Sequence, residues 1–314
     1  MVAVTATSTT DPSVTSLARA SITNGSEAFS IPTERISYAA AAVGSKIYLL
    51  GGQDADGETD LPVLVYNTVA KSWNAGANVP DTVLDGDACA VDGLVYLPGG
   101  WVGAGKVLGE MLIYDPAADT WSKGPQLAAP RDSYAAFCDA DAMRVHVAGG
   151  IDTAGNVLAD HWIYDIAGAT WSAGAPAPSA FFGAPGVSMD GGGLVVGGAD
   201  DLVQPRTTIL RYDFAGGTWS TAGSVLHDVL YTGAADADGL IVQMGGATPS
   251  VTAEWGLVPT KQTQIFDTAA GGTALPGPSL RFARPFAKAV TVGSRVYVFG
   301  GAASPDTAEK ILMP

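Results

Sequence analysis

Histidine, cysteine and basic residues are scarce in this 314-residue chain, which contains three histidines and two cysteines. No two histidines have the spacing of zinc ligands, and no glycine-rich loop ends in the lysine of a phosphate site. The acidic segment 54–60 lacks the ligand spacing of an EF-hand. We therefore expect neither a metal nor another cofactor.

Positive charge and long apolar runs are lacking as well. Sixteen lysines and arginines stand against 31 aspartates and glutamates, and the net charge of −15 argues against nucleic-acid and anionic-membrane partners. No run of about eighteen apolar residues could span a membrane. Residues 1–21 lack the basic start and apolar stretch of a secretory signal, so we expect a cytoplasmic, monomeric protein with a flexible N-terminal tail.

Glycine, in contrast, is abundant, and six Gly-Gly doublets each close a short apolar run. The doublets recur 48 to 55 residues apart, at Gly51-Gly52, Gly99-Gly100, Gly149-Gly150, Gly197-Gly198, Gly245-Gly246 and Gly300-Gly301. In the first four units a tyrosine and then a tryptophan follow at fixed distances, as Tyr66 and Trp73 do in the first. A period near fifty indicates stacked copies of one supersecondary unit.

Each unit has room for four strands, as the second unit illustrates. Strands are predicted over 87–91 and 94–98, with Asp92-Gly93 as the hairpin turn between them. A third strand is predicted over 111–114, and Trp121 opens a fourth.

This pattern of apolar run, glycine doublet, tyrosine and tryptophan resembles the Kelch repeat, and it covers nearly the whole chain. The resemblance implies an all-β fold: a six-bladed β-propeller with four antiparallel strands per blade around a central channel. It also implies a functional mouth, built by the segment that enters each innermost strand and by the loop after each doublet. One propeller domain would then occupy residues 22–314.

The two ends of the chain are expected to complete one blade together. The last unit begins at Arg284 and reaches its third strand at 311–313, so it lacks a fourth. Residues 29–32 have the character of an unattached fourth strand. We predict that the segment 22–32 supplies this strand and closes the ring, which leaves no sheet edge open.

The two cysteines, Cys89 and Cys138, fall in the innermost strands of adjacent blades. Two cysteines in a chain of this length do not imply a disulfide framework. Buried free thiols are the expectation, and they suit a reducing cytoplasm.

Alignment on the doublets places two sets of equivalent residues where the chain enters the innermost strands. The first set is Arg35, Val83, Arg131, Phe181, Val229 and Arg284. Two residues further on, and so on the same strand face, lie Ser37, Asp85, Ser133, Gly183, Tyr231 and Phe286.

The three arginines of the first set admit two interpretations. Their guanidinium groups could hold a carboxylate or phosphate of a ligand, because arginine donates in a bidentate fork. They could instead be structural and pair with an aspartate such as Asp85, Asp87 or Asp132.

Aromatic side chains give the predicted mouth an apolar character, which is typical of small-molecule sites. The aromatic candidates for ligand contact are Phe182, Phe286, Trp101, Trp255, Tyr38 and Tyr134. The long loop after the fifth doublet carries Trp255 and is a candidate lid, or else a neutral insertion. Phe286 could equally fill the channel as core.

Four residues are candidates for proton transfer at the mouth: His227, Asp85, Asp132 and Tyr231. His227 is the histidine predicted to lie nearest the mouth, whereas His146 is assigned to a packed strand and His161 to a peripheral one.

Two function classes follow. The first is a non-redox enzyme, an isomerase, lyase or cyclase, that acts by acid–base chemistry on an anionic or partly apolar small molecule. The stand-alone ring resembles the bacterial sialic acid mutarotases, although no motif here matches their catalytic residues one by one. The second is a protein-interaction module that grips a peptide or partner across the same face.

Overall fold

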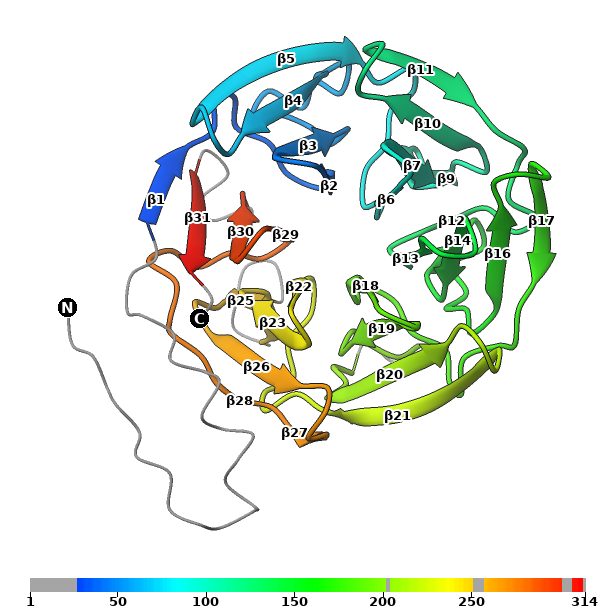
Figure 1. Cartoon of the computed structure of the whole chain (residues 1–314), viewed down its shortest axis with the longest axis vertical. Coiled ribbons are helices and arrows are strands. Elements are labelled where there is room, and N and C mark those ends of the chain that lie inside the picture. Colours follow the sequence, from blue (N-terminus) through cyan, green and yellow to red (C-terminus); the bar gives the residue numbers. More distant parts are fainter. Residues whose placement is uncertain (1–26, 202–203, 251–256, 301–306, 313–314) are drawn as a thin grey trace.

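The computed structural model describes residues 27–201, 204–250, 257–300 and 307–312. Within these ranges every regular element is a β-strand, and no helix there could cross a membrane. Six antiparallel sheets stand around a central axis like the blades of a propeller (Figure 1). The predicted six-bladed ring is therefore confirmed.

Each blade contains four strands, ordered from the channel outward. Blades 1 to 3 consist of β2 (Ala39–Val43), β3 (Lys46–Leu50), β4 (Pro62–Asn67) and β5 (Ser72–Asn78); β6 (Cys89–Val91), β7 (Leu94–Pro98), β10 (Met111–Asp115) and β11 (Thr120–Lys123); and β13 (Ala135–Asp139), β14 (Arg144–Ala148), β16 (His161–Asp165) and β17 (Thr170–Ala173). Blades 4 to 6 consist of β18 (Gly186–Met189), β19 (Gly192–Val196), β20 (Thr208–Asp213) and β21 (Thr218–Ser224); β22 (Gly233–Ala237), β23 (Leu240–Met244), β26 (Thr263–Asp267) and β28 (Leu275–Pro276); and β29 (Lys288–Val292), β30 (Arg295–Phe299), β31 (Thr307–Leu312) and β1 (Glu27–Ser30).

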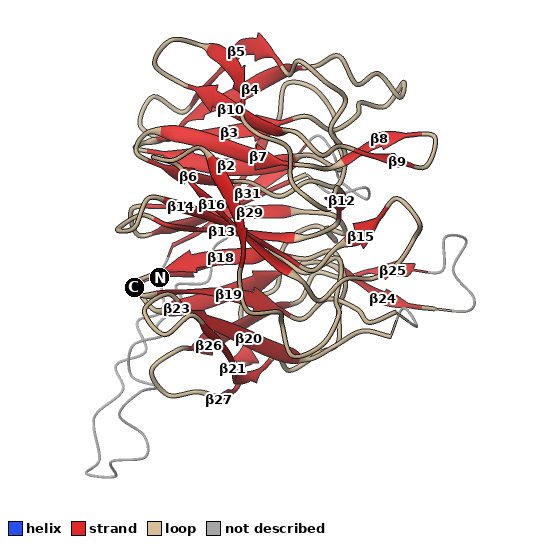
Figure 2. Cartoon of the chain, turned by 90° about the vertical axis from the view of Figure 1, so that its right-hand side faces the viewer, coloured by secondary structure: helices blue, strands red, loops and turns tan. Residues whose placement is uncertain are grey.

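Short additional strands lie outside this scheme. β27 (Gly272–Thr273) runs parallel to β21 at the rim of blade 4. Three small antiparallel pairs each include the strand that directly follows a doublet: β8 (Trp101–Gly103) with β9 (Lys106–Val107), β12 (Arg131–Asp132) with β15 (Ile151–Asp152), and β24 (Ala247–Pro249) with β25 (Leu257–Pro259). In Figure 2 all three pairs lie on one face of the ring.

The glycine doublets allow neighbouring blades to approach closely. Gly51 and Gly52 have φ values of 67° and 86°, a region that favours glycine. A side chain on Gly51 would collide with the Val83 carbonyl of blade 2, and Gly52 donates its N–H to that same carbonyl over 2.8 Å. The doublet therefore fits the backbone of one blade against the entry of the next.

The recurring tryptophans tie blades 1, 3 and 4 to the blade before each of them, whereas the Trp121 indole N–H of blade 2 has no partner among the described residues. Tyr164 and Trp171 of blade 3 pack together with ring centroids 5.2 Å apart. The indole N–H of Trp171 donates to the Pro125 carbonyl of the preceding blade's exit segment over 3.0 Å. Trp219 of blade 4 donates in the same way to Ala175, over 2.8 Å.

The N-terminal segment closes the ring as predicted. β1 pairs antiparallel with β31 in blade 6, from Glu27 opposite Lys310 to Ser30 opposite Thr307. Phe29 stacks on Tyr66 of blade 1 at 4.7 Å, and Trp73 donates to the Ser30 carbonyl over 3.0 Å. β31 begins at Thr307, earlier than the predicted residue 311. The predicted tail, residues 1–21, lies outside the described residues.

The expectation of free thiols is wrong. Cys89 of β6 and Cys138 of β13 form a disulfide between blades 2 and 3, with their Cα atoms 5.8 Å apart. The innermost strands of adjacent blades belong to different sheets, so nothing in the repeat pattern indicated how closely these two thiols approach. The disulfide also removes the argument from reduced cysteines for a cytoplasmic protein.

Candidate functional site at the channel mouth

Six equivalent residues form a ring around one end of the channel, and we call them the mouth ring. Its members are Ser37, Asp85, Ser133, Gly183, Tyr231 and Phe286, one from each blade. All six have φ between 50° and 63°, so five non-glycine residues adopt the left-handed conformation. Sequence alignment on the doublets predicted this set of residues.

Backbone hydrogen bonds join the members of the mouth ring and help offset the cost of that conformation. Five members donate their N–H to the carbonyl of the preceding member over 2.8 to 3.1 Å: Asp85, Ser133, Gly183, Tyr231 and Phe286. Among the described residues no corresponding bond joins Ser37 to Phe286, where blade 1 meets blade 6. The ring of bonds is therefore interrupted at one junction.

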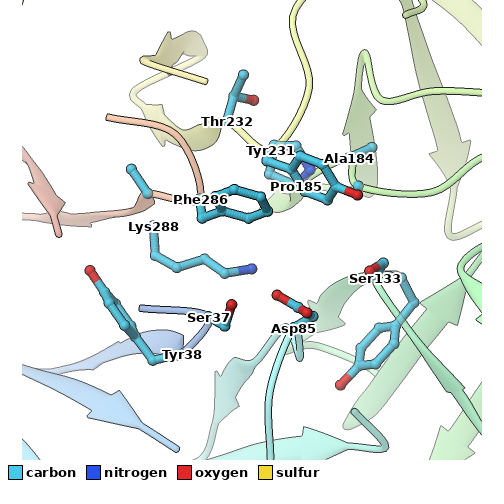
Figure 3. Close-up of a pocket in the computed structure, with 13 residues that line it drawn as sticks. Ser37, Tyr38, Asp85, Ser133, Ala184, Pro185, Tyr231, Thr232, Phe286 and Lys288 are labelled. Atoms are coloured by element: carbon cyan, nitrogen blue, oxygen red, sulfur yellow. The ribbon is translucent and has the colours of Figure 1, made fainter. Parts of the chain in front are cut away.

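A cavity of about 40 Å³ lies at the centre of the mouth ring. Besides the ring members it is lined by Tyr38, Tyr134, Ala184, Pro185, Thr232, Ala287 and Lys288. Figure 3 shows Lys288 of blade 6 and Asp85 of blade 2 extending into the cavity, with the ammonium directed toward the carboxylate. A water needs at least about 10–15 Å³ of such volume, so the cavity is large enough to hold water.

Asp85 is the carboxylate that lines the cavity. Burial raises the pKa of Asp85, while the Ser37 hydroxyl and the Lys288 ammonium act in the opposite direction. Lys288 comes from blade 6, and the carboxylate it contacts is that of Asp87, 3.5 Å from Nζ to Oδ1. A cationic and an anionic side chain thus face one cavity without forming an ion pair with each other.

Two further proton-transfer candidates lie nearby: Tyr231 lines the cavity, and Asp132 precedes Ser133 but does not itself line the cavity. Burial, with a contribution from Asp85, raises the pKa of Asp132 to about 6, although a hydrogen bond from Ser133 opposes the shift. Burial also raises the pKa of Tyr231 to about 12, and the charges of Asp85 and Asp132 add to this effect. A carboxyl group with a pKa near neutrality can act as a general acid or base.

The predicted aromatic residues divide into three groups. Tyr231 and Phe286 stack at 4.3 Å beside the cavity, and Phe182 packs edge-on against Tyr231 at 6.3 Å from a buried position. Trp101 lies in β8 and does not line the cavity. Trp255 lies outside the described residues, so the predicted lid stays a prediction.

Tyr38 and Tyr134 are buried walls of the cavity. Burial raises the pKa of both hydroxyls, so both stay protonated at neutral pH. The Tyr134 hydroxyl donates to the Asp87 carbonyl over 3.1 Å, whereas the Tyr38 hydroxyl has no partner among the described residues.

The three arginines do not line the cavity, and each is almost completely buried. Arg131 makes a bidentate contact with Asp160 at 2.6 and 2.8 Å, and Arg284 contacts Glu309 at 3.1 Å. Arg35 donates to the Pro62 carbonyl over 3.0 Å. These contacts support a structural role for the arginines. The expected partners Asp85, Asp87 and Asp132 are wrong, because the partners are Asp160, Glu309 and the Pro62 carbonyl, each from the arginine's own blade. The three arginines are therefore left out of the site proposed below.

The histidines also lie away from the mouth cavity. His227 is exposed, and its backbone N–H and carbonyl bond to the Gln264 amide over 2.9 and 3.2 Å. His161 is buried rather than peripheral, since its Nε2 lies 3.0 Å from Nδ1 of His146. No group of three His, Cys, Asp or Glu residues in the described ranges could hold a metal ion.

Comparison with known proteins agrees with the architecture. Residues 37–227, more than half of the chain, match the model of the KLHDC2/KLHL20/DRC7 Kelch-repeats domain. This chain belongs to the Kelch-repeat family. The structure of YjhT is similar over 90% of this chain and 95% of that chain, with a TM-score of 0.76 and 15% sequence identity. At that identity the likeness shows the fold alone, and no curated protein matches the sequence significantly.

A second cavity, of about 250 Å³, occupies the channel of this Kelch propeller below the mouth. Its wall consists mainly of small residues of the innermost strands, together with Asp87, Cys89, Asp236 and Lys288. Lys288 and Pro185 line both cavities. The pair of Lys288 and Asp87 therefore lies between the mouth and the rest of the channel.

Lys288 is the site residue that the sequence prediction missed. The next level inward, two residues beyond the mouth ring, is Ala39, Asp87, Ala135, Pro185, Gly233 and Lys288. Asp87 and Lys288 are the charged members of this level, and the other four are small. One further step of two residues along each innermost strand, on the same strand face, would have found both the ion pair and the free space around it.

Proposed function

We propose that this Kelch propeller binds a small molecule at the channel mouth and acts on it by proton transfer. Asp85 and Asp132 would serve as the acid–base groups, with Tyr231 as a hydrogen-bond donor. The observation that carries the proposal is that Asp85, Tyr231 and Lys288 line one cavity. A concave site with a few converging polar groups is typical of small-molecule binding.

The titration behaviour of Asp132 supports acid–base chemistry. With a pKa of about 6, this carboxyl group is mostly ionised at pH 7 yet can still accept and return a proton. Tyr231 stays protonated and can donate a hydrogen bond to an oxygen that gains negative charge. Together they suit removal of a proton beside a carbonyl or hydroxyl group, as in isomerases and lyases.

The cavity is too small to enclose a sugar-sized ligand. A volume of about 40 Å³ admits the polar end of a small ligand and not a whole sugar ring. The remainder of the ligand would lie against the stacked Tyr231 and Phe286, on the face that carries the β8–β9 and β24–β25 pairs. These pairs would shield the reacting group from solvent.

Thermal unfolding with a panel of carboxylates, neutral and acidic sugars and divalent metals tests binding. A ligand at one hundred times its dissociation constant adds roughly 2.7 kcal/mol, which raises the midpoint by a few degrees. Asp85→Asn should abolish the rise, while Asp228→Asn, a change at an exposed residue, should retain it. A panel without any effect would contradict a small-molecule site.

Proton transfer is tested by incubating each stabilising compound with the protein in D₂O. We expect deuterium to enter the compound at a rate that rises with pH through an inflection near 6, because Asp132 must be ionised to act as base. Asp132→Asn should remove the inflection. Binding without any exchange would leave a ligand-binding protein and overturn the enzymatic part.

A protein partner across the same face is the second candidate. Val258 of β25 is 46% exposed, and the projecting pairs could grip a peptide. Deleting residues 102–106 of the β8–β9 pair should then abolish retention of that partner, whereas Asp85→Asn, a change inside the cavity, should leave it intact.

A further inference from the structure

The charged residues at the mouth restrict the chemical class of the ligand more than the volume of the cavity does. Lys288 from blade 6 and Asp85 from blade 2 both line the cavity, and they are partly buried. Removing a charge from water without a partner is costly, so each favours a counter-charge. The two charges attract each other, since Lys288 lowers the pKa of Asp85, but they are not in contact, because the ion pair that Lys288 forms within 4.0 Å among the described residues is with Asp87.

The contact with Asp87 compensates the charge of the Lys288 ammonium only weakly. The contact from Nζ to Oδ1 is 3.5 Å long, whereas a charge-assisted hydrogen bond is typically about 2.7–2.9 Å. The Asp87 carboxylate is also committed elsewhere, since it accepts the backbone N–H groups of Ala136 and Gly186 over 3.0 and 3.1 Å. An ammonium has three donors, so Lys288 retains capacity for an anionic group that enters the mouth.

Asp85 is an acceptor for which the Ser37 hydroxyl is the side-chain donor recorded among the described residues, and a carboxylate has room for further donors. The charges of Asp85 and Asp132 both reach the Tyr231 side chain, so this side of the mouth is anionic and is bounded by an aromatic face. Carboxylates beside an aromatic ring favour a cationic group. The Phe286 carbonyl adds an acceptor, since it receives no backbone hydrogen bond from Ser37 among the described residues.

From these positions we infer that the mouth selects a small zwitterion of the α-amino acid type. The ligand carboxylate would bind Lys288, its ammonium would bind Asp85, and its side chain would lie against Tyr231 and Phe286. This inference rests on the proposed small-molecule site and goes beyond it by naming the ligand class. It also replaces the arginine-bound anion expected from the sequence.

Titration calorimetry with valine and its two truncated analogues tests the inference. Isovalerate keeps the carboxylate and lacks the amine, and isobutylamine keeps the amine and lacks the carboxylate. We expect valine to bind at least tenfold more tightly than either analogue, because it alone satisfies both charges. Equal affinity of valine and one analogue would overturn the inference.

Two variants assign the charges, each with an exposed control. Lys288→Met should reduce valine affinity to that of isobutylamine, and Asp85→Asn should reduce it to that of isovalerate. Lys261→Met and Asp228→Asn remove charges from exposed residues and should leave the affinities unchanged. Circular dichroism of all four variants verifies folding, and valine affinities in the two mouth variants equal to wild type would overturn the inference.

The same measurements separate the two proposals. If no amino acid binds but a neutral or acidic sugar does, and Asp85→Asn abolishes that binding, the ligand class is wrong while the mouth site stands. If neither amino acids nor any compound of the wider panel binds, both proposals fail.

Discussion

The ring is held together differently on its two sides. Across blades 2 to 4 the ties lie at the channel wall: the Cys89–Cys138 disulfide, the Asp87 carboxylate on Ala136 and Gly186, and the Cys138 N–H on Ser188 over 2.8 Å. We call this side the tied arc. Between blades 6 and 1 the chain depends on strand pairing and aromatic packing at the rim, through β1 and Phe29. We call that junction the closure.

The difference between the tied arc and the closure bears on where this propeller would accommodate a ligand. In the tied arc, covalent and charged contacts fix neighbouring innermost strands, and the mouth ring has all its backbone bonds. At the closure the ring of bonds is interrupted, and the Tyr38 hydroxyl and two Arg35 nitrogens lack partners among the described residues. The proposed site combines Asp85 from the tied arc with Lys288 beside the closure, so it spans a rigid side and an adaptable one.

Among the changes that distinguish the closure from the tied arc, removing β1 should have the largest effect on the stability of the ring. A chain that begins at Ile31 loses the outer strand of blade 6 and the Phe29 cluster, and it exposes the edge of β31. We expect it to lose cooperative unfolding altogether, as measured by circular dichroism during heating. A chain that begins at Glu27 is the control and should melt as the full chain does. A truncated chain with an unchanged melting temperature would show that β1 does not close the ring.

Breaking the disulfide should have a smaller effect and should act on the tied arc alone. Cys89 and Cys138 lie 49 residues apart, and a loop of that length corresponds to about 4 kcal/mol of stabilisation. The double variant Cys89→Ala/Cys138→Ala should lose stability of this order in urea unfolding, and wild type in a thiol reductant should match it. Two titratable thiols in the unreduced, denatured wild type would refute the disulfide.

Acidification should have the smallest effect, and it also acts on the tied arc. His161 donates from Nδ1 to the Ala175 carbonyl at 3.3 Å, so its Nε2 accepts from His146 and both rings are held neutral. Burial lowers the pKa of His146 to about 3 and that of His161 to about 4. The unfolded chain binds protons below about pH 6.5 that the folded chain does not, so stability should fall over the mildly acidic range from pH 7 to about 5.5.

A histidine variant isolates this contribution from the titrating carboxylates. His146→Phe keeps an aromatic ring where His146 stacks 5.1 Å from Phe137, and it should flatten the dependence of melting temperature on pH. The exposed His227 offers the control, because His227→Gln should leave the dependence as in wild type. Equal slopes in all three proteins would contradict the buried pair as the source.

Features that repeat could be predicted from the sequence, and features specific to one blade could not. The doublets and the Tyr–Trp spacing predicted the blades, the mouth ring and the closing strand, because each recurs with the period of the fold. The pairing of Arg131 with Asp160 depends on a single acidic residue in one blade. The disulfide and the Lys288–Asp87 pair join residues of different sheets, and their proximity follows from the radius of the ring, which no local pattern contains.

In the left-handed mouth ring the main chain forms the bonds that hold the ring together, and the side chains are left to contact a ligand. Serine, aspartate, glycine, tyrosine and phenylalanine all occupy the same backbone conformation there, since the hydrogen bonds that join the ring involve only main-chain atoms. Exchanging side chains in this ring would therefore keep the main-chain bonds, although a side chain at Gly183 would have to displace the Tyr231 ring, 3.0 Å from the position of its Cβ. Such a propeller could change its ligand through a handful of codons, and paralogues with unrelated specificities could share a single folding pathway.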